Sequence, residues 1–328
     1  MKGVAEWLAR RPVDPIGAHA MTFLRNVFPL IALLGLSSCS NAANSPETLA
    51  RQLQKALDAG DFDAAAKLAD LDGAPAEARF AYFDSVYSCA ADMKCSVAAA
   101  PVDEAFRKGL AEDAKQIDAT PIAAEGVLVV TEKSNDGQGS GELKMPFVKS
   151  GGEYRITVMR PGAATIQKYR AQSNDDLMKQ MFAGGIYEPA SGNRRTDWAT
   201  AAKPLPAGGG EPGQAFVAQT NAMSAAVAAK DPDAAMKAGG RWAELVFAEK
   251  GYDGKSIAKD QRQKKLHAQS QRMLRDVKVT GGYQLGDDAV LVFDARNGSG
   301  WIERGAVLVT RDGASWDVSG KQTVSYPD

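Results

Sequence analysis

Apolar residues recur at helical spacing in the stretch that follows Ser45. The four apolar positions of this stretch are Leu49, Leu53, Ala56 and Leu57. They fall on one face of a helix, so the spacing predicts an amphipathic helix. Ser45 is a good N-cap, and Pro46 takes the first helical position, where its missing N–H costs nothing. Gly60 is expected to end this helix, and Asp61 can cap a short helix after it.

Helical patterns and alternating strand patterns follow one another along the rest of the chain. Further helices are expected over residues 76–87, 102–117 and 258–274. Valine-rich strands follow them, with hairpin turns expected at Asn135-Asp136-Gly137 and at Asn297-Gly298, where residues that tolerate positive φ are present. Long alternating strands after helices predict the α+β class, with helices packed on a curved antiparallel sheet.

The chain repeats part of its own pattern. Residues 59–67 are echoed by residues 229–237, which share the pattern D-x-D-A-A-x-K. Residues 125–130 and 151–156 are matched in the same order by 288–293 and 313–318. Two tandem copies of one domain therefore explain the sequence most economically. No 34-residue period follows the first helix pair, which excludes a tetratricopeptide array.

A short apolar run ends at a cysteine near the start of the chain. Arg25 precedes an apolar segment from Val27 to Leu36, and the small residues Ser37 and Ser38 come directly before Cys39. This order is typical of a cleaved export signal, and the run is about half as long as the ~20 apolar residues that span a bilayer. An ordinary secretory signal, with Cys39 merely near the cleavage point, is the alternative.

The segment from Met21 to Ser40 resembles bacterial lipoprotein signals and their lipobox. The resemblance implies that a diacylglycerol group is attached to Cys39 and that the preceding residues are removed. Two acyl chains suffice for stable membrane attachment. Because Ser40, and not an aspartate, follows the cysteine, the resemblance also implies the periplasmic face of the outer membrane.

These observations divide the chain into six expected parts. They are a mis-assigned N-terminal extension (1–20), a signal peptide (21–38), a lipidated tether (39–45), a first α+β domain (46–160), a connecting helix with a Gly/Pro-rich linker (161–212), and a second α+β domain (213–328). The connecting helix is expected over 165–182. Arg194 and Arg195 lie in the linker and are expected to be solvated, although they could touch anionic lipid.

Charge and cysteine content narrow the function further. The formal net charge of the chain is −1, and this balance argues against a nucleic-acid binder.

Cys89 and Cys95 are expected to form a structural disulfide, since an exported chain permits it. Their spacing is not the C-x-x-C of oxidoreductases, and after Cys39 only His267 could join them as an imidazole ligand. We therefore expect no metal site and no cofactor.

The arrangement resembles the nuclear transport factor 2-like superfamily, and in particular its small bacterial lipoproteins of unknown function. The residues that carry this resemblance are the helix at 56–65, the strand at 127–131 and the ending at 147–156. The resemblance implies a cystatin-like cone, in which helices close one side of a bent sheet and often leave an apolar pocket inside. The second copy has Trp316 and Asp317 where the first has Tyr154 and Arg155.

Other members of this superfold isomerise or dehydrate small molecules with a pocket Asp, Glu, Tyr or His. Tyr82, Asp84 and Tyr87 could line such a pocket, with Asp84 as a base and Tyr87 as a hydrogen-bond donor to an oxyanion. Phe80 and Phe83 lie at helical spacing with Tyr87, and this spacing favours core packing instead.

One helix is strongly basic. The segment 255–275 carries Lys259, Arg262, Lys264, Lys265, Arg272 and Arg275. It could meet an acidic envelope component, but its charges are spread around the helix, so a solvated helix is expected. His267 is interpreted as a surface side chain, because a base needs an orienting partner.

The sequence thus predicts a lipid-anchored periplasmic protein of the cell envelope with a non-catalytic binding or scaffold role. Its expected partners are the membrane, through lipid on Cys39, and an envelope protein or a small hydrophobic ligand. Binding of a small molecule or lipid in a cone pocket, and an isomerase-like or dehydratase-like enzyme, stay as alternatives.

Overall fold

The computed structural model of the protein is described over most of the chain from Ala43 onward. The described residues are 43–91, 93–135, 139–184, 186–187, 194–195, 201–240, 243, 246–249 and 256–328. The predicted signal peptide and Cys39 lie outside them. Within these ranges, no helix is both long and apolar enough to cross a membrane.

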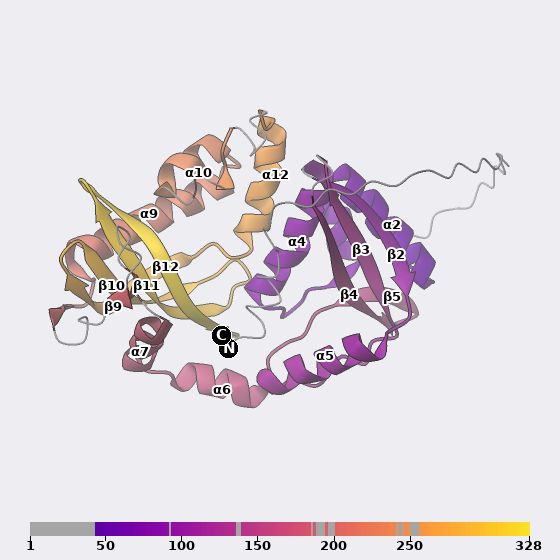
Figure 1. Cartoon of the computed structure of the whole chain (residues 1–328), viewed down its shortest axis with the longest axis horizontal. Coiled ribbons are helices and arrows are strands. Elements are labelled where there is room, and N and C mark those ends of the chain that lie inside the picture. Colours follow the sequence, from indigo (N-terminus) through magenta and orange to yellow (C-terminus); the bar gives the residue numbers. More distant parts are fainter. Residues whose placement is uncertain are drawn as a thin grey trace.

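The structure is mixed α+β, as predicted, with two five-stranded sheets and helices packed against them (Figure 1). The first half contains α2 (Pro46–Ala59), α3 (Phe62–Lys67), β1 (Ala69–Asp70), α4 (Ala76–Ala91), β2 (Met93–Ala100), α5 (Glu104–Gln116), β3 (Gly126–Ser134), β4 (Ser140–Ser150) and β5 (Glu153–Thr157). The second half contains α6 (Ala163–Ala171), α7 (Asn174–Gly184), β6 (Ile186–Tyr187), β7 (Arg194–Arg195), β8 (Lys203–Leu205), α9 (Gly210–Ala228), α10 (Pro232–Ala238), α12 (Lys259–Ser270), β9 (Arg275–Leu285), β10 (Asp288–Arg296), β11 (Ile302–Asp312) and β12 (Ser315–Tyr326).

The two sheets share an antiparallel meander of four strands. In the first sheet the strand order is β1-β5-β4-β3-β2, and in the second it is β12-β11-β10-β9-β8. The fifth strands differ, because β1 runs parallel to β5 at one edge while β8 runs antiparallel to β9 at the opposite edge. A helix precedes each meander: α4 leads into β2, and α12 leads into β9. A division into two domains is a prediction that this shared strand order supports.

The first helix begins and ends where the sequence predicts. The Ser45 side chain accepts a hydrogen bond from the backbone N–H of Thr48, and Pro46 stands at the first helical position. Gly60 closes the helix with φ of 59°, a left-handed conformation that glycine adopts without strain. The Asp61 side chain then caps α3 by accepting from Ala64.

The first core lies between the helices and one face of the first sheet. Leu49, Leu53 and Leu57 of α2 pack there with Leu128 and Phe147 of the sheet. Ala43 is already buried in this cluster, and its carbonyl accepts a 2.7 Å hydrogen bond from the Tyr154 backbone N–H. The fold therefore begins before residue 45, the end of the tether expected from the sequence.

A side chain of α2 covers the free edge of β2, a strand that the sequence analysis did not predict. Gln54 donates from its amide nitrogen to the Cys95 carbonyl at 3.1 Å and accepts from the Val97 backbone N–H at 2.8 Å. These two bonds replace the pairing that a neighbouring strand would supply. An exposed strand edge invites pairing with another chain, so Gln54 protects this edge.

Helices cover both faces of the second sheet. Along β10, successive side chains point to opposite faces. Phe293 packs with Phe216 of α9 on one face, and Val292 packs with Leu177 of α7 on the other. The second core thus has three layers.

The stretch expected to be a connecting helix and linker takes part in this packing. It forms two helices, α6 and α7, which lead from the first half of the chain to the second sheet (Figure 1). Within the expected linker, Lys203–Leu205 forms β8 and pairs with β9, and α9 begins at Gly210. The glycine-rich and proline-rich composition therefore marks an edge strand and a helix start over 203–210, because Pro204 lacks a donor and suits an edge position. Arg194 and Arg195 form β7, which pairs with β6.

The β10–β11 turn differs from the expected two-residue Asn297-Gly298 turn. It runs from Asn297 to Trp301, and its left-handed glycine is Gly300, with φ of 80°. Gly298 has another role: a Cβ atom there would overlap the backbone of Ser270 and Gln271 at the end of α12. In the first sheet, Asp136 and Gly137 of the expected turn lie outside the described residues.

The Cys89–Cys95 disulfide is present as predicted. It joins the last turn of α4 to the third residue of β2 and so closes a short local loop.

Candidate functional site

The residues proposed to line an enzyme pocket are engaged in packing. The Tyr82 hydroxyl donates a 2.7 Å hydrogen bond to the Ala65 carbonyl, and burial raises the pKa of Tyr82. Tyr87 is 2% exposed, and the Lys265 ammonium lies 5.3 Å from the centre of its ring. Asp84 is half-buried on the same helix, and its charge acts on Arg272 of the second half. These groups bind neighbouring elements, which favours the core-packing alternative.

The basic helix α12 bridges the two halves of the molecule. In Figure 1 it stands beside α4, between the two sheets, and α4 and α12 are in contact. The expectation of a solvated helix is therefore wrong. Leu266 and Ala268 of this helix are buried, with 1% and 0% exposure. Two cores share this helix, because Ala268 belongs to the first core cluster while Leu266 packs with Met223 of α9.

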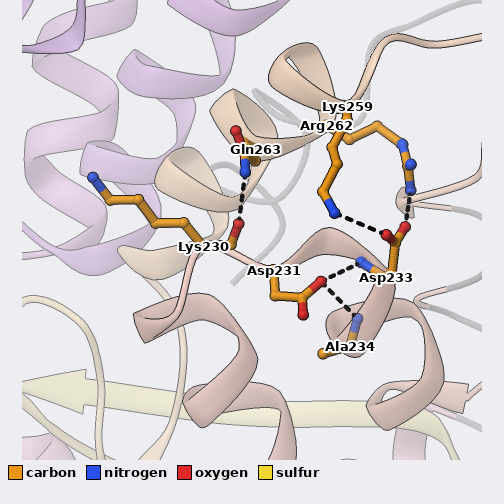
Figure 2. Close-up of polar contacts among 7 residues, drawn as sticks. All are labelled: Lys230, Asp231, Asp233, Ala234, Lys259, Arg262 and Gln263. Carbon is orange, nitrogen blue, oxygen red and sulfur yellow. Dashed lines mark hydrogen bonds and ion pairs between the residues drawn. The ribbon is translucent and has the colours of Figure 1, made fainter.

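Charged and polar groups tie the start of α12 to α10 and the turn before it (Figure 2). Asp233 accepts from Arg262 at 2.6 Å and from Lys259 at 3.2 Å. These two hydrogen bonds, with that of Arg262 the stronger, lower the pKa of the Asp233 carboxyl. Gln263 donates to the Lys230 carbonyl at 3.1 Å, in the turn that precedes α10. Asp231, in the same turn, caps α10 through its own side chain.

The other side of α12 contacts the first half. His267 stacks on Phe62 of α3 with ring centres 4.4 Å apart, and it meets Phe83 of α4 edge-on at 5.1 Å. Lys264 donates to the Ala59 carbonyl at the end of α2 at 3.3 Å. The interpretation of His267 as a surface side chain is therefore wrong, because two phenylalanine rings cover its imidazole.

The end of α12 and the residues that follow it form a polar contact with α4. Arg79 donates to the Gln271 side chain at 2.9 Å. Arg272 lies over the Phe80 ring, with its guanidinium carbon 3.7 Å from the ring centre, and pairs with Glu77 at 3.8 Å. Burial lowers the pKa of Arg272, and the charge of Glu77 opposes this shift. A planar guanidinium that stacks and pairs at once is the geometry that arginine, and not lysine, provides.

A groove of about 910 Å³ opens in the second half of the chain, between α9 and the β11–β12 turn. One wall is a face of α9 that contains Gln214, Ala215, Ala218 and Gln219. The opposite wall is the β11–β12 turn with Trp316 and Asp317, and the end of α10 closes one side. Ligand pockets commonly enclose about 300–1,000 Å³. The groove is therefore large enough to hold a small ligand.

Two buried polar atoms of the groove walls have no hydrogen-bond partner. They are the indole nitrogen of Trp316 and the side-chain oxygen of Gln219. Trp316 is 5% exposed, and Arg311, which pairs with Glu211 at 3.3 Å, lies 5.8 Å from its ring centre. Buried polar atoms usually have a partner. Because both atoms are shielded from solvent, they lie behind the groove surface and not on it.

A second hollow, of about 470 Å³, lies between α6 and α7. Lys168 and Lys179 line it together with Asp176, whose pKa is lowered by hydrogen bonds from Ser173. Neither hollow is lined by Tyr82, Asp84 or Tyr87.

One group of potential metal ligands occurs in the described part of the chain. Sulfur atoms of Cys89 and Cys95 and a carboxylate oxygen of Glu132 lie within 4.8 Å of one another. Because the two cysteines are disulfide-bonded, their sulfurs are not thiolate ligands in this state.

Comparisons with known proteins do not assign this chain to a family. No protein-family model matches the chain, and no curated protein matches it. The chain is similar to the crystal structure of a cystatin-like protein from Ruminococcus gnavus ATCC 29149, at 13% sequence identity, over 83% of this chain and 87% of that one. With a TM-score of 0.24, this likeness is too distant to carry an argument.

Proposed function

We propose that the protein is a lipid-anchored component of the bacterial cell envelope that binds a small ligand without catalysis, in the groove between α9 and the β11–β12 turn. The observation that carries this proposal is the groove itself, whose volume suits a small ligand and whose walls include Trp316, Gln214 and Gln219. Its mixed lining calls for a ligand with both polar and apolar groups. This differs from the small hydrophobic ligand that a cone pocket would take.

The predicted anchor would hold the first sheet close to the membrane. The lipobox supports lipid on Cys39, and the fold begins at Ala43, whose carbonyl is bonded to β5. Four extended residues span at most about 14 Å. A lipidated Cys39 would therefore leave the first sheet little freedom to move away from the bilayer surface.

The state of the candidate catalytic groups favours binding over catalysis. The Tyr82 hydroxyl donates a hydrogen bond to the Ala65 carbonyl, and the His267 ring packs against Phe62 and Phe83. A general acid or base must reach the proton that it transfers. A scaffold role is the second candidate, and the bridging helix α12 favours it because this helix joins both halves into one body.

The anchor is tested by fractionating cells that produce the chain with Cys39→Ser. We expect the variant to leave the envelope fraction and appear in the soluble periplasmic fraction, while the unchanged chain stays with the membrane. Full retention of the variant in the membrane would overturn the lipid anchor.

The groove is tested by placing a photo-reactive amino acid at Ala218, an exposed position of its α9 wall. Ala225, exposed two turns further along α9 and outside the groove lining, is the matched control. We expect irradiation of intact cells to give one discrete low-mass adduct from position 218 and none from position 225. Equal labelling at both positions, or none at either, contradicts a ligand in the groove; large protein adducts at 218 favour the scaffold.

A further inference from the structure

His267 lies in the contact between the two halves of the chain. Its ring stacks on Phe62 at an angle of 23° and meets Phe83 at 81°. Phe62 and Phe83 belong to the first half, and His267 is carried by α12, which leads into the second sheet. Phe62 and Phe83 also contact each other, with ring centres 6.0 Å apart, so the neutral imidazole completes a cluster of three rings.

The charges that face this imidazole come from three elements besides its own. Asp63 of α3 favours a proton on the ring, whereas Lys230, in the turn before α10, and Arg79 of α4 oppose it. On α12 itself, Lys264 and Lys265 come shortly before His267. The ammonium group of Lys264 contacts the Ala59 carbonyl, and that of Lys265 lies near the Tyr87 ring. Among the described residues, the charge of Asp63 acts on the ring more strongly than that of Lys230 or Arg79 alone, and burial acts more strongly than any of the three.

We propose that His267 is a proton-sensitive clasp: protonation of its imidazole weakens the docking of α12 on α3 and α4, so the two sheets separate more readily in acid. A protonated imidazole loses hydration water where it packs against Phe62 and Phe83, and it is repelled by the nearby cations Lys230 and Arg79. A cation–π attraction to Phe62 offsets part of this cost. Protonated histidines at interfaces are a recurrent means by which proteins respond to mild acid.

The direction and pH range of the effect follow from the burial of the ring. Burial, with the cations, lowers the pKa of His267 below its ordinary value of 6.5. Because the docked state binds a proton less readily than the undocked state, docking is strongest at neutral pH and above. It weakens as the pH falls through about 6.5 and changes no further once the pH is below the pKa of the docked ring.

Hydrogen exchange of the full chain between pH 7.5 and 5.5, corrected for the intrinsic exchange rate, tests this clasp. We expect the protection of α12 and of the facing side of α4 to fall severalfold over this range. Strand β10 serves as the internal reference, since it is buried in the second core, and its protection should stay constant. His19, the other histidine, precedes the predicted lipidation site, so the response can be assigned to His267.

Three variants separate the clasp from a general loss of stability. His267→Phe keeps an aromatic ring without a proton to gain, and we expect its α12 protection to be flat over the pH range. His267→Arg carries a permanent charge and should show low protection at every pH. Asp63→Asn removes the favourable carboxylate and should enlarge the loss in acid.

Two results would overturn the clasp. One is protection of α12 in the unchanged chain that does not vary between pH 7.5 and 5.5. The other is a loss in His267→Phe as large as that in the unchanged chain. Neither result depends on a ligand in the groove. The test of the clasp is therefore independent of the test of the proposed function.

Discussion

The guanidinium of Arg272 lies over the ring of Phe80, with 3.7 Å between the guanidinium carbon and the ring centre. Phe80 belongs to α4 in the first half of the chain, while Arg272 lies between α12 and β9 in the second. Together with the ion pair between Arg272 and Glu77, this contact holds the residues after α12 against α4. The two halves are thus joined by specific contacts and not only by the covalent chain.

Replacing Arg272 with alanine should therefore lower the free energy of unfolding by about 1–3 kcal/mol, because a cation–π contact and an ion pair are lost together. Arg272→Lys keeps the charge but not the planar stack, so we expect it to recover less than half of the loss. Urea unfolding of the three chains measures this. A change below about 0.5 kcal/mol in Arg272→Ala, the ordinary range for surface substitutions, would show that the contact contributes little.

Gly298 should be intolerant of even one added methyl group. A Cβ atom there would overlap the backbone of Ser270 and Gln271, which cannot move aside as a flexible side chain can. We expect Gly298→Ala to destabilise the fold by about 1–3 kcal/mol.

The matched control for this substitution is Gly109→Ala. Gly109 lies inside α5 with no atom near enough to meet a Cβ. Alanine is favoured over glycine by about 0.5–1 kcal/mol in a helix, so this control should be more stable than the unchanged chain. The melting temperatures of both variants, measured by thermal unfolding, test this prediction. Equal melting temperatures would refute the close approach of the turn to α12.

Removal of the disulfide should have a modest effect. Cys89 and Cys95 close a loop of seven residues, for which the chain-entropy model gives a stabilisation of about 2 kcal/mol. The double variant Cys89→Ser, Cys95→Ser should fold with a lower denaturation midpoint, measured in urea without reductant. Two free thiols titrated in protein taken directly from the envelope would contradict the disulfide.

Local signals in the sequence predict several elements well. Ser45, Pro46 and Gly60 define α2, because capping depends on residues adjacent in the chain. The cysteine pair also could be predicted, since its spacing is local and the predicted export signal implies an oxidising compartment.

Other elements depend on contacts that local patterns do not contain. Strand β2 reads Met-Lys-Cys-Ser-Val-Ala-Ala-Ala, and alanine has little preference for strands, so the edge position and Gln54 determine its conformation. The sequence pattern of β10 does not reveal that its alternate side chains pack in two different cores, for a different reason. Both of its faces are covered, and buried strands of this kind show a continuous apolar run.

The bridging role of α12 was the least predictable feature. Its charged residues favour a solvated helix, and its partners Phe62, Phe80 and Phe83 lie almost 200 positions earlier in the chain. The groove was missed for a similar reason, because its two walls come from α9 and from a turn about 100 residues later.

Native mass spectrometry of the chain from residue 40 onward, prepared gently from the periplasm, tests the proposed binding function most directly. We expect one discrete mass above that of the polypeptide. This mass should be lost in Ala218→Arg, where a long side chain fills the groove, and kept in Ala225→Arg. A bare polypeptide in the unchanged chain, or a bound mass that persists in Ala218→Arg, would contradict the proposed binding function.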